Sequence, residues 1–174
     1  MTPIIRRTIA VVGICVTTLV ASANATAQDA RSEGEHGERD RCRPAAIARD
    51  WVAAWNSHDP NAVAAVFTPD AFYEDLPFGL RVHGTAEIHD FAQFFFTVVP
   101  DLNVEYVNSC IEEGHGTIEW IFSGTDQGIY STGNRFSVRG VTVIDARRGR
   151  IARNSDYYDL ATILRQLGLL PPGL

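Results

Sequence analysis

The chain has 174 residues, of which 45% are hydrophobic and 21% are charged, and its formal net charge at pH 7 is −6. This length and composition suit one globular domain with a core of its own. The excess of acidic residues disfavours nucleic acid and anionic membranes as partners, because both carry negative charge.

The N-terminal residues 1–27 have the pattern of a signal peptide. Arg6 and Arg7 precede the uncharged apolar run of residues 9–21, which is too short to span a bilayer and leads into small residues. We expect cleavage after Ala27 and therefore a periplasmic or secreted protein. A retained membrane anchor is one alternative, and a lipoprotein attached at Cys15 is another. We expect no membrane contact after cleavage.

The next residues, 28–42, contain no large apolar side chain, so we expect a flexible lead. The folded domain should then span residues 43–172. Cys42 precedes its first predicted helix, and Cys110 lies near the end of a predicted strand. In an oxidising compartment these two cysteines can form a disulfide; the alternative is that each is an independent small hydrophobic residue.

Helical spacing of apolar residues, together with helix-start signals, predicts four helices. They are residues 44–57, 59–67, 85–98 and 159–167. Asp59 followed by Pro60 is typical of a helix start, and Thr85 and Asp159 can cap the helices that follow them.

Alternating apolar and polar residues, rich in Val, Ile, Thr and aromatics, predict strands. They are residues 71–75, 102–111, 117–125, 136–146 and 150–158. Three helices and a short strand before a four-stranded antiparallel meander indicate an α+β fold. The sheet must curve over the helices to hide one face. We therefore expect a cone-shaped α+β barrel, a curved antiparallel sheet wrapped over three to four helices around one pocket.

Two stretches of the sequence resemble a known family. The run WVAAWNSHDPNAVAAVFTPDAFYEDLP, and later TGNRFSVRGVTVI and SDYYDLATILRQLGLLP, resemble SnoaL-like polyketide cyclases of the nuclear transport factor 2-like superfamily. The resemblance spans about residues 43–171 and implies the same cone-shaped fold. The superfamily includes cyclases, isomerases, hydrolases and members without known catalysis. The resemblance thus implies cofactor-independent acid/base chemistry on a small hydrophobic molecule, without choosing the reaction.

The same resemblance implies one catalytic residue. In SnoaL-like cyclases an Asp on the last long strand is the general acid and base, and Asp156 matches that position. The loop after Thr125 commonly carries a His in the cyclases, whereas this chain has Asp126 followed by Gln127 and Gly128. That departure argues against the cyclase mechanism, though not against the fold, and Asp126 is kept as a candidate ligand-binding residue.

Strand register suggests which residues accompany Asp156. A tight turn at residues 148–149 joins the last two predicted strands, and counting outward places Val141 opposite Asp156. The same count places Arg139 opposite Tyr158. If this face points into the cone, a carboxylate, a guanidinium and a phenol meet in an apolar pocket, which is an acid/base site in outline. Catalysis, ligand orientation and a structural ion pair all remain possible roles for Asp156 and Arg139.

A further carboxylate is expected from the first predicted strand. Glu74 and Asp75 are adjacent and face opposite sides, so only one can enter the pocket. Asp75 is the expected one and could position a water or hydroxyl group; the alternative is that it caps the turn at Pro77.

The remaining candidate ligand-binding residues are mostly aromatic. They are Trp55, Phe72, His83, Phe95, Trp120 and Val141. A pocket with such walls suits a small hydrophobic ligand. The sequence has no metal-ligand cluster at the usual spacing, no phosphate-binding glycine loop and no nucleophilic Ser or Cys elbow, so we predict no metal and no cofactor.

Two alternatives to an exported enzyme stay open. One is a non-catalytic periplasmic protein that binds a small molecule in the same pocket. The other is an interaction module in which the outer face of the sheet forms a homodimer and the cavity is vestigial. Val138, Ile144 and Tyr157 are the expected apolar residues of that outer face.

Overall fold

The computed structural model of this chain describes residues 46–171. The predicted signal peptide, the predicted lead and Cys42 lie outside the described residues, so a disulfide between Cys42 and Cys110 stays a prediction. Four helices are described: α2 (Ala46–Asn56), α3 (Pro60–Ala65), α4 (Gly84–Val98) and α5 (Leu160–Gln166). Six strands are described: β1 (Phe67–Asp75), β2 (Leu80–His83), β3 (Asn103–Glu112), β4 (His115–Thr125), β5 (Arg135–Arg147) and β6 (Arg150–Tyr158).

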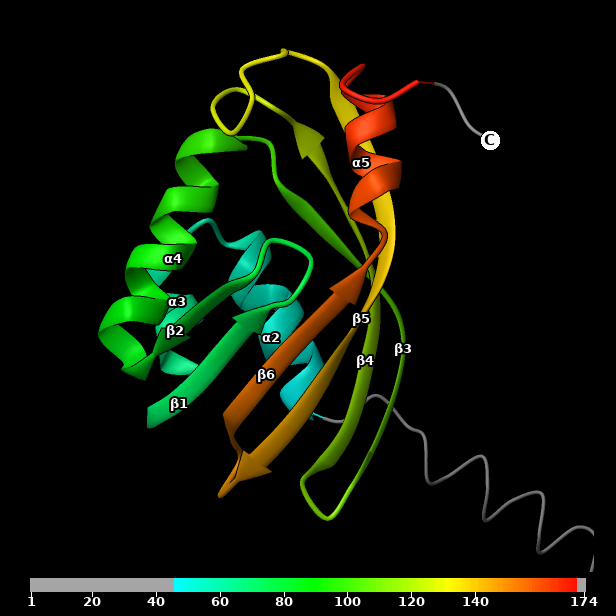
Figure 1. The fold of residues 1–174 in the computed structure, drawn as a ribbon. Coiled ribbons are helices and arrows are strands. Elements are labelled where there is room, and N and C mark those ends of the chain that lie inside the picture. Colours follow the sequence, from blue (N-terminus) through cyan, green and yellow to red (C-terminus); the bar gives the residue numbers. More distant parts are fainter. Residues whose placement is uncertain (1–45, 172–174) are drawn as a thin grey trace, which may run out of the picture. The chain divides into compact units, whose positions relative to one another are not determined.

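Figure 1 shows the α+β architecture that the sequence predicts. The six strands form one curved, open sheet in the order β2-β1-β6-β5-β4-β3. Strands β3 to β6 form the predicted antiparallel meander, whereas β1 pairs in parallel with β6. Helices α2, α3 and α4 cover one face of this sheet, and α5 packs against β5. None of the helices within residues 46–171 has the length and apolar character needed to cross a membrane.

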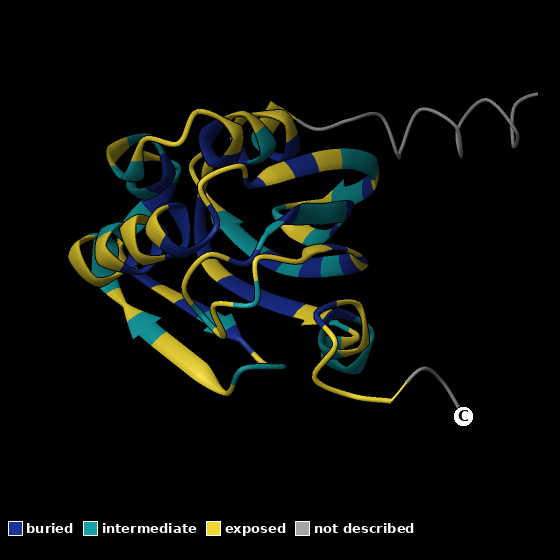
Figure 2. Ribbon diagram, turned by 90° about the horizontal axis from the view of Figure 1, so that it is seen from above, coloured by how far each residue is buried: buried dark blue, intermediate teal, exposed yellow. Residues whose placement is uncertain are grey.

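The core fills the space between the sheet and the helices, where Figure 2 shows the buried residues gathered. Trp51 and Trp55 of α2, Phe91 and Phe95 of α4, and Trp120 of β4 are all at most 9% exposed. Their rings pack with centroid distances of 4.9 to 6.4 Å. Burial of each large apolar side chain contributes about 1.5–3 kcal/mol, so these rings fasten α2 and α4 to the sheet.

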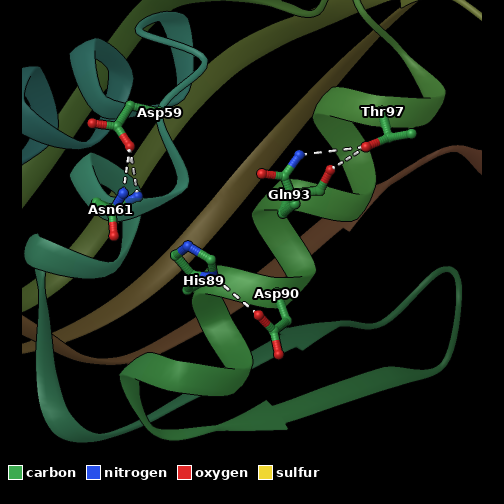
Figure 3. A network of polar contacts seen from close by, with 6 residues as sticks. All are labelled: Asp59, Asn61, His89, Asp90, Gln93 and Thr97. Carbon is green, nitrogen blue, oxygen red and sulfur yellow. Dashed lines mark hydrogen bonds and ion pairs between the residues drawn. The ribbon is translucent and has the colours of Figure 1, made fainter.

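Two predicted helix starts are confirmed by side-chain contacts. Asp59 precedes α3, and its Oδ1 accepts the backbone N–H of Asn61 at 2.8 Å and the side-chain amide at 3.0 Å (Figure 3). Asp159 precedes α5, and its Oδ1 accepts the backbone N–H of Thr162 at 3.1 Å. Each carboxylate thus satisfies a donor that the first helical turn leaves unpaired.

The start of α4 differs from the prediction that Thr85 caps it. The helix begins at Gly84, and His83 occupies the capping position without a side-chain hydrogen bond. Instead, Glu87 Oε2 accepts the backbone N–H of His83 at 2.7 Å, so a side chain of the first turn pairs with the backbone donor of the capping residue. The other contacts in Figure 3 lie within α4 and join residues at most four positions apart.

The register of β5 and β6 agrees with the prediction only near the turn. Arg147 pairs with Arg150 around residues 148–149, whose φ angles of 52° and 77° are those of a tight hairpin turn. The pairing then moves by one position at residues 145 and 146, because β6 holds one extra residue, Ala152, between their partners Arg153 and Ile151. Because side chains alternate across a strand, every β5 residue beyond the bulge faces the side opposite to the one predicted.

Candidate active site

Two carboxylates lie side by side where the first and last strands meet. Asp75 of β1 is the register partner of Asp156 of β6. Neighbours in register point to the same face of a sheet, and both side chains enter the space beneath the helices, where they are 4% and 5% exposed. Glu74 faces the other way, where it accepts hydrogen bonds from Arg81 and Ser155.

Each carboxylate accepts a hydrogen bond from the tyrosine of the other strand. The hydroxyl group of Tyr73 in β1 donates to Asp156 Oδ2 at 2.5 Å. The hydroxyl group of Tyr158 in β6 donates to the two carboxylate oxygens of Asp75 at 2.9 and 3.0 Å. In each strand the Tyr and the Asp are two residues apart, which puts them on one face. The hydrogen bonds therefore cross from strand to strand in both directions.

The other carboxylate oxygen of Asp156 is held by two more donors. Thr142 Oγ1 lies 2.5 Å and Asn154 Nδ2 lies 2.8 Å from Asp156 Oδ1. The indole Nε1 of Trp120 donates to Thr142 Oγ1 at 2.7 Å, so the single hydroxyl proton of Thr142 is directed at Asp156. Gly140, the register partner of Trp120, leaves room for this indole, since a Cβ there would lie 2.2 Å from the ring.

Burial is the largest cause of the pKa shifts in this site. It raises the pKa of Asp156 to about 6, with a smaller contribution from the charge of Asp75, and the three hydrogen-bond donors oppose the rise. Burial also raises the pKa of Asp75, against the hydrogen bonds from Tyr158 and from the Phe78 N–H. Burial is the largest cause of the raised pKa of both tyrosines, and the charges of the two carboxylates raise it further. The phenols therefore remain protonated donors at neutral pH.

These groups form part of the wall of an apolar cavity of about 50 Å³. Eight of its twelve lining residues are aromatic, Leu102 and Val104 are aliphatic, and the last two are Asp75 and Asp156. Only Tyr158 and Phe122 among them are half-buried rather than buried, so the cavity approaches the surface beside these two rings. Within residues 46–171 no three His, Cys, Asp or Glu side chains converge as a metal site.

The structure brings six of the predicted site residues together around the cavity. They are Trp55, Asp75, Phe95, Trp120, Asp156 and Tyr158. Asp75 enters the cavity and also accepts the N–H of Phe78 at 3.2 Å in the turn after β1. The two expectations for Asp75, a pocket carboxylate and a turn cap, are therefore both met by its position.

Arg139 and Val141 do not face the cavity, which is a correction that follows from the bulge. Asp156 lies opposite Thr142 instead of Val141, and Tyr158 lies opposite Gly140 instead of Arg139. Arg139 lies on the outer face of the sheet, where its Nε is 2.7 Å from Glu119 Oε1 and its side chain is 63% exposed. Arg139 is therefore not among the main groups that set the pKa of Asp156.

Phe72 and His83 also point away from the cavity. They are register partners on β1 and β2, and alternation puts them on the face opposite to Tyr73. Their rings contact each other with centroids 4.4 Å apart, and Phe72 is 46% exposed. The aromatic character of Phe72 suggests burial in the pocket wall, whereas the parity of the strand places its ring outside.

Asp126 organises a loop and does not line the cavity. Its buried carboxylate accepts the backbone N–H groups of Tyr130 at 3.1 Å and Thr132 at 2.9 Å, and the Thr132 hydroxyl group at 2.9 Å. Burial acts to raise the pKa of Asp126, but these hydrogen bonds outweigh it and lower the pKa. Asp126 therefore stays ionised and shapes residues 126–134.

Sequence reasoning missed Tyr73 and Thr142, which both bind Asp156. Tyr73 had a readable signal, because Tyr73 and Asp75 share the two-residue spacing of Asp156 and Tyr158. Thr142 had none, since only the bulge brings it opposite Asp156.

The predicted outer-face residues need a similar correction. Val138 and Ile144 are 4% and 0% exposed and belong to the core, whereas Tyr157 is 47% exposed. An outer groove is lined instead by Tyr157 and Val141 beside the Arg139–Glu119 ion pair. A homodimer through this face stays a prediction.

The sequence and the fold are both similar to those of known proteins. The family profile described as SnoaL-like polyketide cyclase matches residues 45–167. No curated protein shows significant sequence similarity to the chain.

Solved structures share the fold. A protein from Catenulispora acidiphila with a ketosteroid isomerase-like fold, in complex with trimethylamine, is 28% identical, has a TM-score of 0.68, and matches over 72% of this chain and 95% of its own. TsrD from Streptomyces laurentii is 25% identical, with a TM-score of 0.63 over 71% of this chain and 93% of its own. An LEH-like epoxide hydrolase from M. tuberculosis is 18% identical and has a TM-score of 0.58, and the match covers 70% of this chain and 86% of its own. At this identity the match shows the fold alone.

Proposed function

Because the chain belongs to the SnoaL-like polyketide cyclase family, we propose that it is an exported enzyme for cofactor-independent acid/base chemistry on a small hydrophobic molecule. The observation that supports this most is the Asp156 carboxylate, which lines an aromatic cavity and has a pKa of about 6. A general base works best when its pKa lies near the working pH. At pH 7 a group with this pKa is about 90% ionised and ready to accept a proton. Export rests on the predicted signal peptide.

The arrangement suits removal of a proton from a carbon atom beside a carbonyl group. Asp156 accepts that proton while Tyr73, Thr142 and Asn154 hold its carboxylate in position. Tyr158, at the half-buried edge, turns its phenol proton from Asp75 toward the substrate oxygen and stabilises the negative charge that develops there. Neutral Asp156 then returns the proton, either to another carbon atom in an isomerisation or to the alkoxide oxygen that forms when the enolate carbon closes a ring onto a second carbonyl group. This is an isomerase-type or cyclase-type reaction.

Deuterium exchange tests this function without knowledge of the natural substrate. Small β-keto esters and β,γ-unsaturated cyclic ketones would be incubated with the protein in D₂O and followed by NMR. Asp156→Asn should exchange at least about 100-fold more slowly than the wild type. Asp90→Asn, whose side chain is 84% exposed on α4, is the matched control and should not change the rate. Equal rates for the wild type and Asp156→Asn would refute Asp156 as the base.

A second candidate function is non-catalytic binding of a small amine. Eight aromatic residues and two carboxylates line the cavity, a combination that attracts alkylammonium cations. The Catenulispora acidiphila protein is in complex with trimethylamine. Calorimetry with trimethylammonium chloride tests this function. A binder should lose roughly tenfold in affinity in both Asp75→Asn and Asp156→Asn. Unchanged affinity in both variants would exclude it.

A further inference from the structure

The cavity is small for a hydrophobic ligand. Its volume of about 50 Å³ holds a group of only a few heavy atoms. Sites for drug-sized molecules enclose roughly 300–1,000 Å³. A ligand of that size therefore cannot lie wholly inside, and most of it must extend past Tyr158 and Phe122, where the cavity approaches the surface.

Half-buried and exposed apolar side chains continue from this edge. Phe78 lies in the turn after β1, with its ring centroid 6.4 Å from that of Tyr158 and 6.5 Å from that of Phe95. Leu80 of β2 is the register partner of Asp75 and so shares its face, yet it is 43% exposed. The first strand pair thus carries an apolar surface from the carboxylate outward.

Two other segments add to this surface. Phe94 of α4 is 49% exposed, and its ring centroid is 5.6 Å from that of Phe95 in the cavity wall. Tyr130 is 41% exposed and close enough to Tyr158 to contribute to its raised pKa. The loop of Tyr130 is fastened to α4 by the N–H of Gln127, which donates to the carbonyl oxygen of Val98 at 2.8 Å. We name Phe78, Leu80, Phe94 and Tyr130 the mouth rim.

We propose that the substrate is a neutral aliphatic carbonyl compound whose head enters the cavity and whose apolar chain lies on the mouth rim. The identity of the substrate's carbonyl head rests on the proposed function, whereas the position of its apolar chain rests on the mouth rim. Exposed apolar clusters of this kind mark binding surfaces. The ring contacts of Phe78 and Phe94 with the cavity wall favour a ligand chain as the occupant. The acidic net charge of the protein disfavours an anionic lipid surface.

Binding of straight-chain methyl ketones, from 2-butanone to 2-nonanone, tests the proposal by calorimetry. Each added methylene that reaches the rim should raise affinity about twofold to fourfold. Leu80→Ser and Phe94→Ser should each lower the affinity for 2-nonanone by on the order of tenfold and leave the affinity for 2-butanone unchanged. Phe72→Ser is the matched control, because Phe72 is 46% exposed but faces away from the cavity.

The outcomes separate this inference from the proposed function. A chain-length dependence that the two rim variants abolish and Phe72→Ser retains supports the mouth rim, even if no ketone exchanges deuterium. Exchange that depends on Asp156 supports the proposed function, whatever the chain length does. Affinity that does not rise along the ketone series, or a loss in Phe72→Ser equal to that in the rim variants, would overturn the inference.

Discussion

Asp75 and Asp156 lie in register on the two parallel strands of the sheet, and each accepts a hydrogen bond from a tyrosine of the opposite strand. The charge of Asp75 is one cause of the raised pKa of Asp156. Like charges in one buried site disfavour each other, so the site favours one ionised carboxylate over two. The crossed phenols keep both carboxyl groups oriented in either charge state.

The raised pKa of Asp156 predicts a contribution to stability that is lost as the pH rises. Folding raises this pKa from 3.8 to about 6, so the folded state favours the protonated form. The contribution is fully present below pH 3.8 and disappears as the pH rises through about 6. Relative to Asp156→Asn, the wild type should lose about 2 kcal/mol of unfolding free energy between about pH 4 and pH 7. Urea unfolding across this range measures it, and a constant difference between the two proteins would contradict the prediction.

Tyr73 is expected to act through Asp156 as a positioning residue. Its hydrogen bond lowers the pKa of Asp156. In Tyr73→Phe, the rising limb of the plot of exchange rate against pH should therefore move to a higher pH. A shift of one pH unit would slow exchange by on the order of tenfold on that limb and leave the alkaline plateau nearly unchanged. Tyr158→Phe is the comparison for the position of this limb, because the hydroxyl group of Tyr158 donates to Asp75 and not to Asp156. A limb that stays in place in Tyr73→Phe would argue that Tyr73 supports structure only.

Arg139→Ala should leave deuterium exchange unchanged. The guanidinium lies on the outer face, 63% exposed, and its ion pair with Glu119 is open to solvent. Such pairs contribute less than about 1 kcal/mol, so the melting temperature should change little. If Arg139→Ala slowed exchange as much as Asp156→Asn does, the outward position of Arg139 would be wrong.

Gly140→Ala should damage the site through packing. The added methyl group would lie 2.2 Å from the Trp120 ring, so the indole must move away from Thr142. Overpacking of this kind destabilises proteins by about 1–3 kcal/mol. Thermal unfolding would show the loss, and Ser137→Ala on an exposed position of the same strand is the control. Equal melting temperatures for the two variants would contradict the close packing described for Gly140.

Much of the fold follows from local sequence patterns. Asp59 with Pro60, and Asp159, mark helix starts because their side chains pair with free backbone donors of the first turn. Long alternating segments identify β3 to β6, because one face of each must be buried. β2 escaped prediction since its four residues include three exposed ones and too short an alternation to recognise.

The candidate site was harder to predict because it depends on contacts between distant segments. Asp156 and Tyr158 could be placed from one strand and a resemblance. Arg139 was misplaced because one extra residue in β6, Ala152, changes the parity of β6 relative to β5, and no residue pattern marks that bulge. The parallel pairing of β1 with β6 joins the two carboxylates across half the chain, and this pairing is a property of the topology.

That parallel pairing also sets an order of assembly. β1 forms hydrogen bonds with β2, its neighbour in the chain, whereas its other edge is filled by β6, the last strand to be synthesised among those of residues 46–171. Until then the edge of β1 is open to other chains, and Tyr73 and Asp75 have no partners on β6. We therefore expect catalytic competence to arrive late in folding, with closure of the sheet, and a chain that ends before residue 150 to be prone to aggregation.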